Sequence, residues 1–156
     1  MEVCPSIVLN SDASENVAYN NPDFPAYIKR GQLSRYPDFR AVSHWHDDLE
    51  FILILDGQML YAVNGQKISL QTGEGIFVNS HCIHYGYSDC HNECFFICIL
   101  LSPQLISVNN YFVENCLNPL IQNIHFPYQP LNPSILWQNS ILRDLEMLYK
   151  KNVDEI

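Results

Sequence analysis

Short apolar runs alternate with turn-forming residues over the middle of the chain. The apolar runs cover residues 51–55, 59–63, 76–78, 83–87 and 95–101. Asp56-Gly57, Asn64-Gly65 and Thr72-Gly73 separate the first of these runs. Asn64-Gly65 is the strongest short hairpin pattern, and residues 67–70 would form its returning strand. Short strands at close spacing with glycine turns predict an all-β barrel or sandwich.

A helical pattern replaces the strands in the last third of the chain. Ser102-Pro103 and Asn132-Pro133 each combine an N-capping residue with a proline suited to the first helical position. We expect one or two short helices after the first pair, ending before Asn118-Pro119, and one more strand over residues 124–128. An amphipathic helix over residues 133–150 is predicted after the second pair.

The apolar residues of this last helix recur at intervals of four, four and three positions. They are Trp137, Ile141, Leu145 and Leu148. Such a stripe covers the protein's own core or contacts a second copy of the chain. The chain ends soon after this helix, so we expect it to be a piece of something larger.

Three parts follow from these patterns. Residues 1–24 are polar and rich in asparagine, which predicts a flexible N-terminal arm or a frayed terminus. Residues 25–130 would form the barrel, and residues 131–156 would form the C-terminal helix with a linker. A chain of 156 residues is long enough for one domain with a full core.

Charge excludes one class of partner. The net charge is −9, and no Lys or Arg lies between Lys67 and Arg143. A protein that contacts nucleic acid needs a basic stripe to neutralise phosphates. We therefore expect no direct nucleic-acid contact by these residues.

The chain has no pattern typical of export or of a membrane segment. Residues 1–5 lack a basic region followed by an apolar one. The longest apolar run, residues 94–101, is far shorter than the roughly 20 residues of a membrane helix. We expect a cytoplasmic protein with its six cysteines reduced. Cys90, Cys94 and Cys98 are spaced by four, which is compatible with a thiolate site, but small core residues are the favoured interpretation.

Residues 44–50, His-Trp-His-Asp-Asp-Leu-Glu, carry the main candidate chemistry. Because side chains alternate along a strand, His44, His46 and Glu50 can share one face. His84 follows one hairpin later. Three imidazoles and a carboxylate suit a divalent metal such as zinc, nickel or iron, or a polar pocket for a small ligand.

Other residues near this block have two interpretations each. Trp45 has the opposite parity, so it would stack on an effector or, as we favour, pack the outer face of the barrel against the C-terminal helices. Tyr61 and Tyr85 would line the pocket or serve as ordinary strand residues. Three arginines would hold an anionic effector or form a solvated face: Arg30, Arg35 and Arg40.

The same residues carry a resemblance to a known family. His44, His46, Glu50 and Gly57 have the spacing of the first cupin motif. The second motif is incomplete: Gly73 and His84 are present, but Asn79 and His81 replace its proline and its glycine. Residues 32–37, 44–51 and 55–57 resemble the N-terminal sensing domain of AraC-type transcription regulators. The resemblance extends from about residue 25 to the end.

The resemblance implies a mainly β fold, a cupin-like barrel (a double-stranded β-helix or jelly roll) followed by C-terminal α-helices. It implies a small effector such as a sugar or small acid, often bound without metal, near His44, His46, Glu50 and His84. It also implies homodimerisation through the last helix and a separate helix-turn-helix domain that is absent from this chain. The expected role is therefore regulatory and not enzymatic.

A second hypothesis is a stand-alone metal-dependent cupin enzyme of the dioxygenase, isomerase or decarboxylase type. The complete set of metal-position residues motivates it: His44, His46, Glu50 and His84. The missing proline and glycine of the second motif stand against it. A metal-free sugar-binding or structural cupin is a third.

Overall fold

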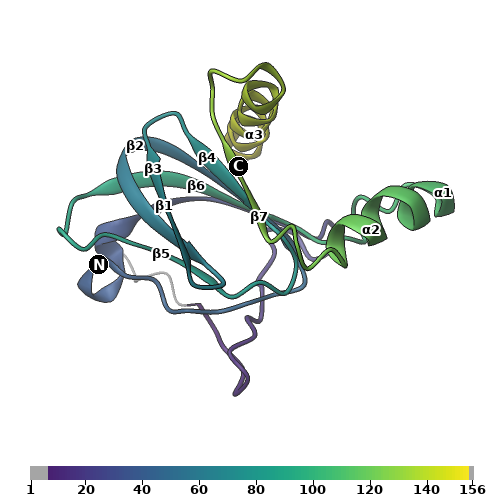
Figure 1. Cartoon of the computed structure of the whole chain (residues 1–156), viewed down its shortest axis with the longest axis horizontal. Helices are drawn as coiled ribbons and strands as arrows, with labels where there is room; N and C mark the ends of the chain where they lie inside the picture. The colour runs from purple at the N-terminus through teal and green to yellow at the C-terminus, as the bar shows by residue number, and fades with distance from the viewer. Residues whose placement is uncertain (1–6, 155–156) are drawn as a thin grey trace.

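The computed structural model describes residues 7–154, which form a β-barrel with helices outside it (Figure 1). The strands of this part are β1 (Ala26–Gln32), β2 (Leu49–Val63), β3 (Gln66–Gln71), β4 (Gly75–Val78), β5 (His84–Tyr87), β6 (Cys94–Leu101) and β7 (Tyr128–Leu131). The helical elements are η1 (Leu33–Arg35), η2 (Pro37–Phe39), α1 (Asn110–Phe112), the π-helical η3 (Val113–Leu117), α2 (Asn118–Ile121) and α3 (Leu136–Asp154). The mainly β fold and the C-terminal helix are confirmed.

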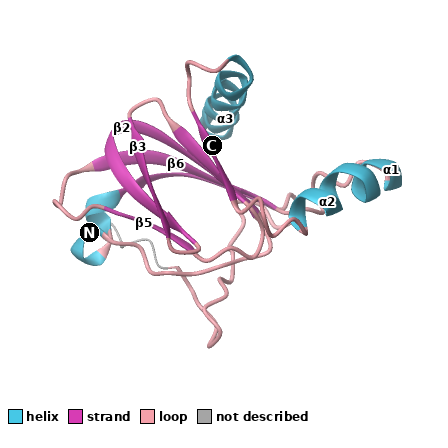
Figure 2. Cartoon of the chain, in the orientation of Figure 1, coloured by secondary structure: helices cyan, strands magenta, loops and turns pink. Residues whose placement is uncertain are grey.

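The long strand β2 holds the barrel together. Its first half pairs with β6 and β4, and its second half pairs with β3 and β5. Strand β1 continues the sheet beyond β6, and β7 continues it beyond β4. Every pairing between these strands is antiparallel. Because β2 pairs with strands of both halves, it places residues on both halves of the barrel (Figure 2).

The predicted turn at Asp56-Gly57 is wrong, because β2 runs through it. The pairing with β6 shifts between Ile54 and Asp56, which marks a β-bulge, and Gly57 has a φ of 94°. A Cβ atom on Gly57 would lie 2.3 Å from the Glu93 carbonyl oxygen. Glycine is therefore needed here for a bend and a close strand approach, not for a reversal of the chain.

The bulge changes which residues face the barrel interior. Ile52 and Ile54 belong to the interior core before it, and Met59 and Tyr61 belong to the same core after it. The inward positions are therefore even-numbered before the bulge and odd-numbered after it, as one extra residue requires.

The other turns follow the sequence patterns. Val63 pairs with Gln66 across Asn64-Gly65, whose φ angles of 47° and 82° are those of a type I′ hairpin. Gly73 has a φ of 86° in the turn before β4. The hairpin and the strands that flank it are confirmed.

The helical region differs from the prediction at its ends. Residues after Ser102-Pro103 form turns, and the first helix begins at Asn110, where the Asn109 side chain accepts a hydrogen bond from the Phe112 amide. Asn118-Pro119 lies inside a continuous helical run and does not end it. The Asn118 amide donates to the Val113 carbonyl in the π-helical turn, and Pro119 follows in the first turn of α2.

The last strand and the last helix each begin later than predicted. Strand β7 spans Tyr128–Leu131 instead of residues 124–128, and α3 begins at Leu136 instead of 133. Asn132 accepts hydrogen bonds from the Ser134 amide and hydroxyl at 2.9 and 2.7 Å, and Gln138 accepts one from the Asn132 amide at 2.7 Å. The Asn-Pro pair thus shapes the turn before the helix.

Two apolar layers flank the sheet. The interior core fills the barrel, and a second cluster joins the outer face of the sheet to α3 through Leu53, Leu142 and Leu145. The α1–α2 region extends from one end of the barrel (Figure 1) and packs through Leu117. None of the described helices combines the length and apolar character needed to cross a bilayer.

Part of the N-terminal segment contacts the chain that leads into the barrel, where Ser14 pairs with Trp45 in an isolated β-bridge. A hairpin of the same segment projects away from the barrel (Figure 1). The Glu15 amide donates to the Trp45 carbonyl at 2.8 Å, and the Trp45 indole donates to the Asp12 carbonyl at 3.0 Å. Trp45 therefore packs against this segment and not against the C-terminal helices, which corrects that prediction. The boundaries at residues 24 and 130 stay predictions.

Candidate metal and ligand site

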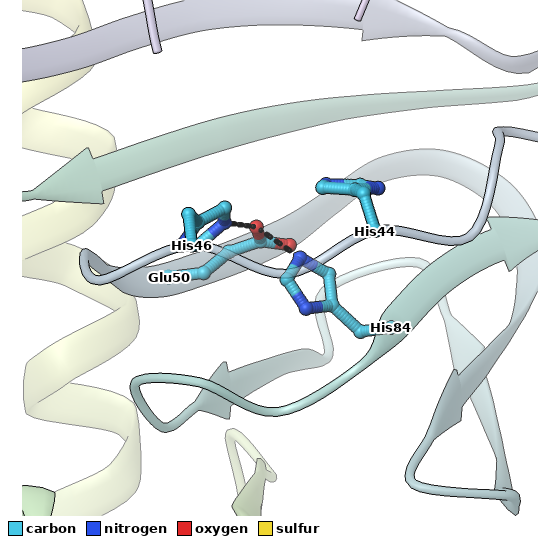
Figure 3. A group of neighbouring side chains, drawn as sticks. All are labelled: His44, His46, Glu50 and His84. Carbon is cyan, nitrogen blue, oxygen red and sulfur yellow. Dashed lines mark hydrogen bonds and ion pairs between the residues drawn. The ribbon is translucent and has the colours of Figure 1, made fainter. Parts of the chain in front are cut away.

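Three segments bring a polar cluster into the barrel. His44 and His46 lie in the extended chain before β2, Glu50 lies on β2 and His84 begins β5 (Figure 3). His44 and His84 pair as an isolated β-bridge, which draws the two segments together. All four side chains are buried, with at most 6% of each residue exposed. We call these four residues the His₃Glu cluster.

The carboxylate of Glu50 is the centre of the cluster. Its Oε2 atom lies 3.0 Å from His46 Nε2 and 2.9 Å from His84 Nε2. The Tyr61 hydroxyl donates to its Oε1 atom from the second half of β2. One ligand atom from each member of the His₃Glu cluster lies within 4.8 Å of the others.

Backbone carbonyls fix the orientation of all three imidazoles. Nδ1 of His44 lies 2.7 Å from the Val42 oxygen, Nδ1 of His46 lies 2.9 Å from the Asp48 oxygen, and Nδ1 of His84 lies 2.8 Å from the Cys82 oxygen. A carbonyl only accepts hydrogen bonds, so each Nδ1 carries the proton. In a neutral imidazole, Nε2 then presents a lone pair to the cluster, as in a metal ligand whose other nitrogen is held by an outer partner.

The ionisation of these groups is strongly coupled. Burial alone would raise the pKa of Glu50, but His84 and His46 hold it well below its ordinary value. Burial alone would lower the pKa of His46, but the hydrogen bond and charge of Glu50 outweigh burial and raise it. Burial, reinforced by His84, lowers the pKa of His44 to about 4. Burial and the charge of Glu50 raise the pKa of Tyr61, which keeps its hydroxyl a donor.

These facts fit a divalent cation. Two Nε2 atoms facing one carboxylate oxygen need a positive charge between them, either a proton on an imidazole or a metal ion. Nitrogen and carboxylate donors together suit zinc, nickel or iron. His44, His46, Glu50 and His84 would hold such an ion.

A cavity of about 300 Å³ adjoins the cluster. Its wall includes His44, Glu50 and Tyr61, with apolar residues of the interior core such as Ile52 and Phe96 beside them. The volume is at the lower end of the range of about 300–1,000 Å³ that is typical of ligand sites. The cavity can therefore take a small organic molecule with polar groups toward the His₃Glu cluster.

The structure brings five of the predicted site residues together and leaves one out. His44, His46, Glu50, His84 and Tyr61 meet as described. Tyr85 lies on the opposite face of β5 from His84, where the Arg40 guanidinium lies 5.4 Å from the centre of its ring. Tyr85 does not line the cavity. Adjacent strand residues point to opposite faces, so His84 and Tyr85 could not both face inward.

Glu15 and Lys29 are charged residues of the cavity wall that sequence reasoning missed. Glu15 Oε2 lies 3.5 Å from His44 Nε2 and comes from the N-terminal segment. No local pattern marks it, since its position depends on contact with Trp45. Lys29 alternates with Tyr27 and Gly31 on β1, a pattern that indicates one common face.

The structure places Arg40 at the surface and two of the cysteines in or beside the interior core. Arg40 forms an ion pair with Asp89 at 3.3 Å, as expected for a solvated face. The five cysteines within residues 7–154 are free. Among them Cys94 is buried in the interior core, as predicted, and Cys98 packs against it and lines the cavity.

The predicted helical stripe straddles the edge of the buried face of α3. Leu145 is 4% exposed and Ile141 is half-buried, whereas Trp137 and Leu148 are 55% and 41% exposed. Further exposed apolar residues lie on the outer side of α3. We call the exposed set the α3 strip: Leu136, Trp137, Met147 and Leu148.

Comparisons with known proteins agree with this architecture. Residues 29–109, more than half of the chain, match the AraC-like ligand binding domain family. The uncharacterized HTH-type transcriptional regulator YdeC of Bacillus subtilis (strain 168) is 25% identical over 137 residues, which are 88% of this chain and 47% of that protein. The chain thus spans about half the length of this curated relative.

Two solved structures are also similar to about half of the chain. A cupin-like protein from Thermotoga maritima is 18% identical with a TM-score of 0.49, covering 55% of this chain and 64% of its own. A predicted oxalate decarboxylase from the same organism is 21% identical with a TM-score of 0.45, covering 50% and 68%.

Proposed function

Because the chain belongs to the AraC-like ligand binding domain family, we propose that it is the small-molecule sensor of an AraC-type transcription regulator. The observation that carries the proposal is the cavity of about 300 Å³ that opens onto the His₃Glu cluster and Tyr61. A small effector would bind there. The DNA-binding helix-turn-helix part would lie outside these 156 residues, as the half-length match to a regulator supports.

Helix α3 is suited to carry a change in the cavity to the rest of a regulator. It packs against β1, β2, β6 and β7, which include walls of the cavity. The contact is close: a Cβ atom on Gly75 would lie 2.8 Å from the Leu142 side chain. An effector that binds one arrangement of the barrel better than another would shift α3 with it.

The α3 strip would form the homodimer contact. Its four apolar residues are exposed on the helix side that faces away from the barrel, and Asp144 and Ser140 lie among them. Association through this strip would place two copies of a following DNA-binding part side by side, which suits two half-sites on one duplex.

A divalent metal would be part of the effector site when present. It would supply a Lewis-acidic point for an oxygen of the effector. The chain's own contribution is to hold the imidazoles through their Nδ1 contacts and to balance the charge through Glu50.

A ligand screen on the purified chain tests the sensor function. Wild-type protein and the Tyr61→Phe and Tyr111→Phe variants would be screened by thermal shift against a library of metabolites. We expect compounds that stabilise the wild type and Tyr111→Phe equally and Tyr61→Phe less, because Tyr61 lines the cavity and Tyr111 is 75% exposed. Stabilisation that is insensitive to Tyr61 would contradict the proposed site.

A chimera tests the regulatory and dimeric roles. The chain would be fused to a helix-turn-helix domain that represses a reporter only as a dimer. We expect repression that responds to the compounds found above and is lost in Leu148→Asp. A chain that stays monomeric in sedimentation at every concentration, with no response to any compound, would exclude the sensor function.

One observation favours an alternative, a metal-dependent cupin enzyme. The three imidazoles are oriented as metal ligands although the second cupin motif lacks its proline and glycine. Metal analysis of protein purified without a histidine tag decides this. Stoichiometric metal that is lost in His44→Ala and His46→Ala, together with turnover of a bound compound, would support the enzyme; bound compounds that remain unchanged would support the sensor.

A further inference from the structure

The cavity has a basic residue at its mouth that the His₃Glu cluster does not use. Lys29 lies on β1 and pairs with Cys98 of β6 across the sheet. Direct partners in an antiparallel pair have their side chains on the same face. Cys98 packs on the interior core, so Lys29 belongs to the interior face, and both residues line the cavity.

The neighbouring residue on β1 has the opposite orientation. Arg30 pairs with Ile97, which belongs to the outer cluster beside α3. Its guanidinium lies 4.9 Å from the centre of the Phe95 ring. Both residues belong to the cavity wall, but the Arg30 guanidinium is held over the Phe95 ring, whereas Lys29 faces the interior.

Lys29 has no anionic partner among the residues that the structure describes. Its Nζ atom lies 5.2 Å from the centre of the Tyr27 ring, and its side chain is exposed although it faces the cavity. The acidic residues of the cavity wall are engaged elsewhere: Glu50 by His46, His84 and Tyr61, and Glu15 beside His44. A protein of net charge −9 thus keeps an unneutralised ammonium at the entrance to its ligand site.

The cavity favours one kind of anion. Arg30 and Arg35 add two further basic residues to its wall, and apolar side chains such as Leu33, Met59 and Phe96 form much of the rest. Because Glu15 and Glu50 lie on the same wall, a doubly charged group would meet more repulsion than a singly charged one.

From these contacts we infer that the effector is a small organic monocarboxylate with an apolar body, whose carboxylate binds Lys29 at the mouth of the barrel. The inference rests on the proposed sensor function and deepens it. The apolar body would contact the interior core, and the far end of the molecule would approach the His₃Glu cluster.

Matched pairs of probes test the inference. Benzoate with benzamide, and hexanoate with hexanamide, have nearly the same shape but differ in charge; inorganic phosphate and glucose are added as a dianion and a neutral sugar. Binding to the purified chain would be measured by calorimetry and ligand-detected NMR, both after treatment with EDTA and with zinc added. We expect each acid to bind about tenfold or more tighter than its amide, the value of one charge-assisted contact.

Two variants that each remove one positive charge separate the role of the cavity mouth from that of the metal. Lys29→Gln acts on the cavity wall, whereas Lys67→Gln acts on β3, outside the cavity. We expect Lys29→Gln to abolish the preference for acids in both the EDTA-treated and the zinc-loaded protein, and Lys67→Gln to retain it. Circular dichroism confirms that both variants fold, which the exposure of both side chains predicts.

The other outcomes overturn the inference in distinguishable ways. Equal binding of acid and amide, or equal behaviour of the two variants, removes the role of Lys29 and leaves the sensor function standing if any probe still depends on Tyr61. A preference for acids only with zinc, retained in Lys29→Gln, assigns the carboxylate to the metal. Tighter binding of phosphate assigns a phosphorylated ligand. No binding of any probe at millimolar concentration contradicts both the inference and the proposed site.

Discussion

The inside of the barrel and the outside of α3 depart from ordinary burial in opposite directions. The His₃Glu cluster places charged and polar groups where almost no water reaches them, while the α3 strip leaves Trp137 and Leu148 exposed at 55% and 41%. Buried polar groups and exposed apolar groups are the informative exceptions in a soluble fold. The interior exception is satisfied within the chain by hydrogen bonds, whereas the exterior one requires a partner to be covered. This difference supports the proposed ligand site inside the barrel and the proposed association surface on α3.

Removing Glu50 should have the largest effect. Glu50→Ala leaves the His46 and His84 imidazoles and the Tyr61 hydroxyl without their shared partner in a buried site. We expect the free energy of unfolding of the EDTA-treated chain to fall by about 3–5 kcal/mol, as for other broken buried ion pairs. Urea denaturation measures it, with the exposed Glu114→Ala as control. A loss as small as that of the control would mean that the cluster does not stabilise the fold.

The two faces of α3 give the next largest contrast. Leu145→Ala opens a cavity under the helix and should cost about 2–5 kcal/mol of stability. Leu148→Ala should change the stability of the monomer by no more than about 0.5 kcal/mol. Denaturation at low protein concentration measures both. The reverse order would show that Leu148, and not Leu145, holds α3 to the barrel.

Metal addition should stabilise the interior specifically. At a zinc concentration about a hundredfold above its dissociation constant, the stability of the chain should rise by about 2.7 kcal/mol. Differential scanning calorimetry with and without EDTA tests this. His84→Gln should lose the increment, and the exposed His125→Gln should keep it. An equal increment in both variants would place the metal outside the His₃Glu cluster.

A polar contact near the surface should have the smallest effect. Burial alone would raise the pKa of Glu93, but hydrogen bonds from Gln32, Ser34 and the Cys94 amide outweigh it and lower this pKa to about 2. A carboxyl group whose pKa is lowered in the folded state stabilises the protein above its unfolded pKa. Its contribution is therefore present above about pH 4.5 and is lost as the pH falls toward 2.

Comparing the wild type with Glu93→Gln across this pH range isolates the contribution. We expect a difference of about 1 kcal/mol at neutral pH, discounted for solvent screening, that shrinks toward zero as the pH approaches 2. A difference that stays constant down to pH 2 would show that the glutamate charge is not responsible.

Local sequence patterns predicted much of the interior. The even spacing of His44, His46 and Glu50 was sufficient to place them together, and Asn64-Gly65 gave its hairpin because both positions need a positive φ. Tyr85 was misplaced because the alternation that brings His84 inward was not applied to its neighbour.

Long-range contacts explain what the patterns missed. Glu15 reaches His44 only because its segment hydrogen-bonds with Trp45, and no periodicity encodes that contact. Asp56-Gly57 resembles a turn in composition, and only the Glu93 backbone nearby distinguishes a bulge from a reversal. The start of α1 is set by the side-chain cap of Asn109, and the turn that Asn132 shapes delays the start of α3, which propensity does not locate to the residue.

The bulge in β2 exchanges the inward-facing and outward-facing positions for every later residue of the strand. Glu50 lies upstream of it and Tyr61 downstream, and their side chains meet only because one extra residue lies between the two phases of the strand. Deleting Leu55 would restore a regular ladder and turn Tyr61 out of the barrel, while Glu50 kept its place. A more regular β2 would thus remove the Tyr61 hydroxyl from the site. The complete site therefore depends on the irregularity of this strand.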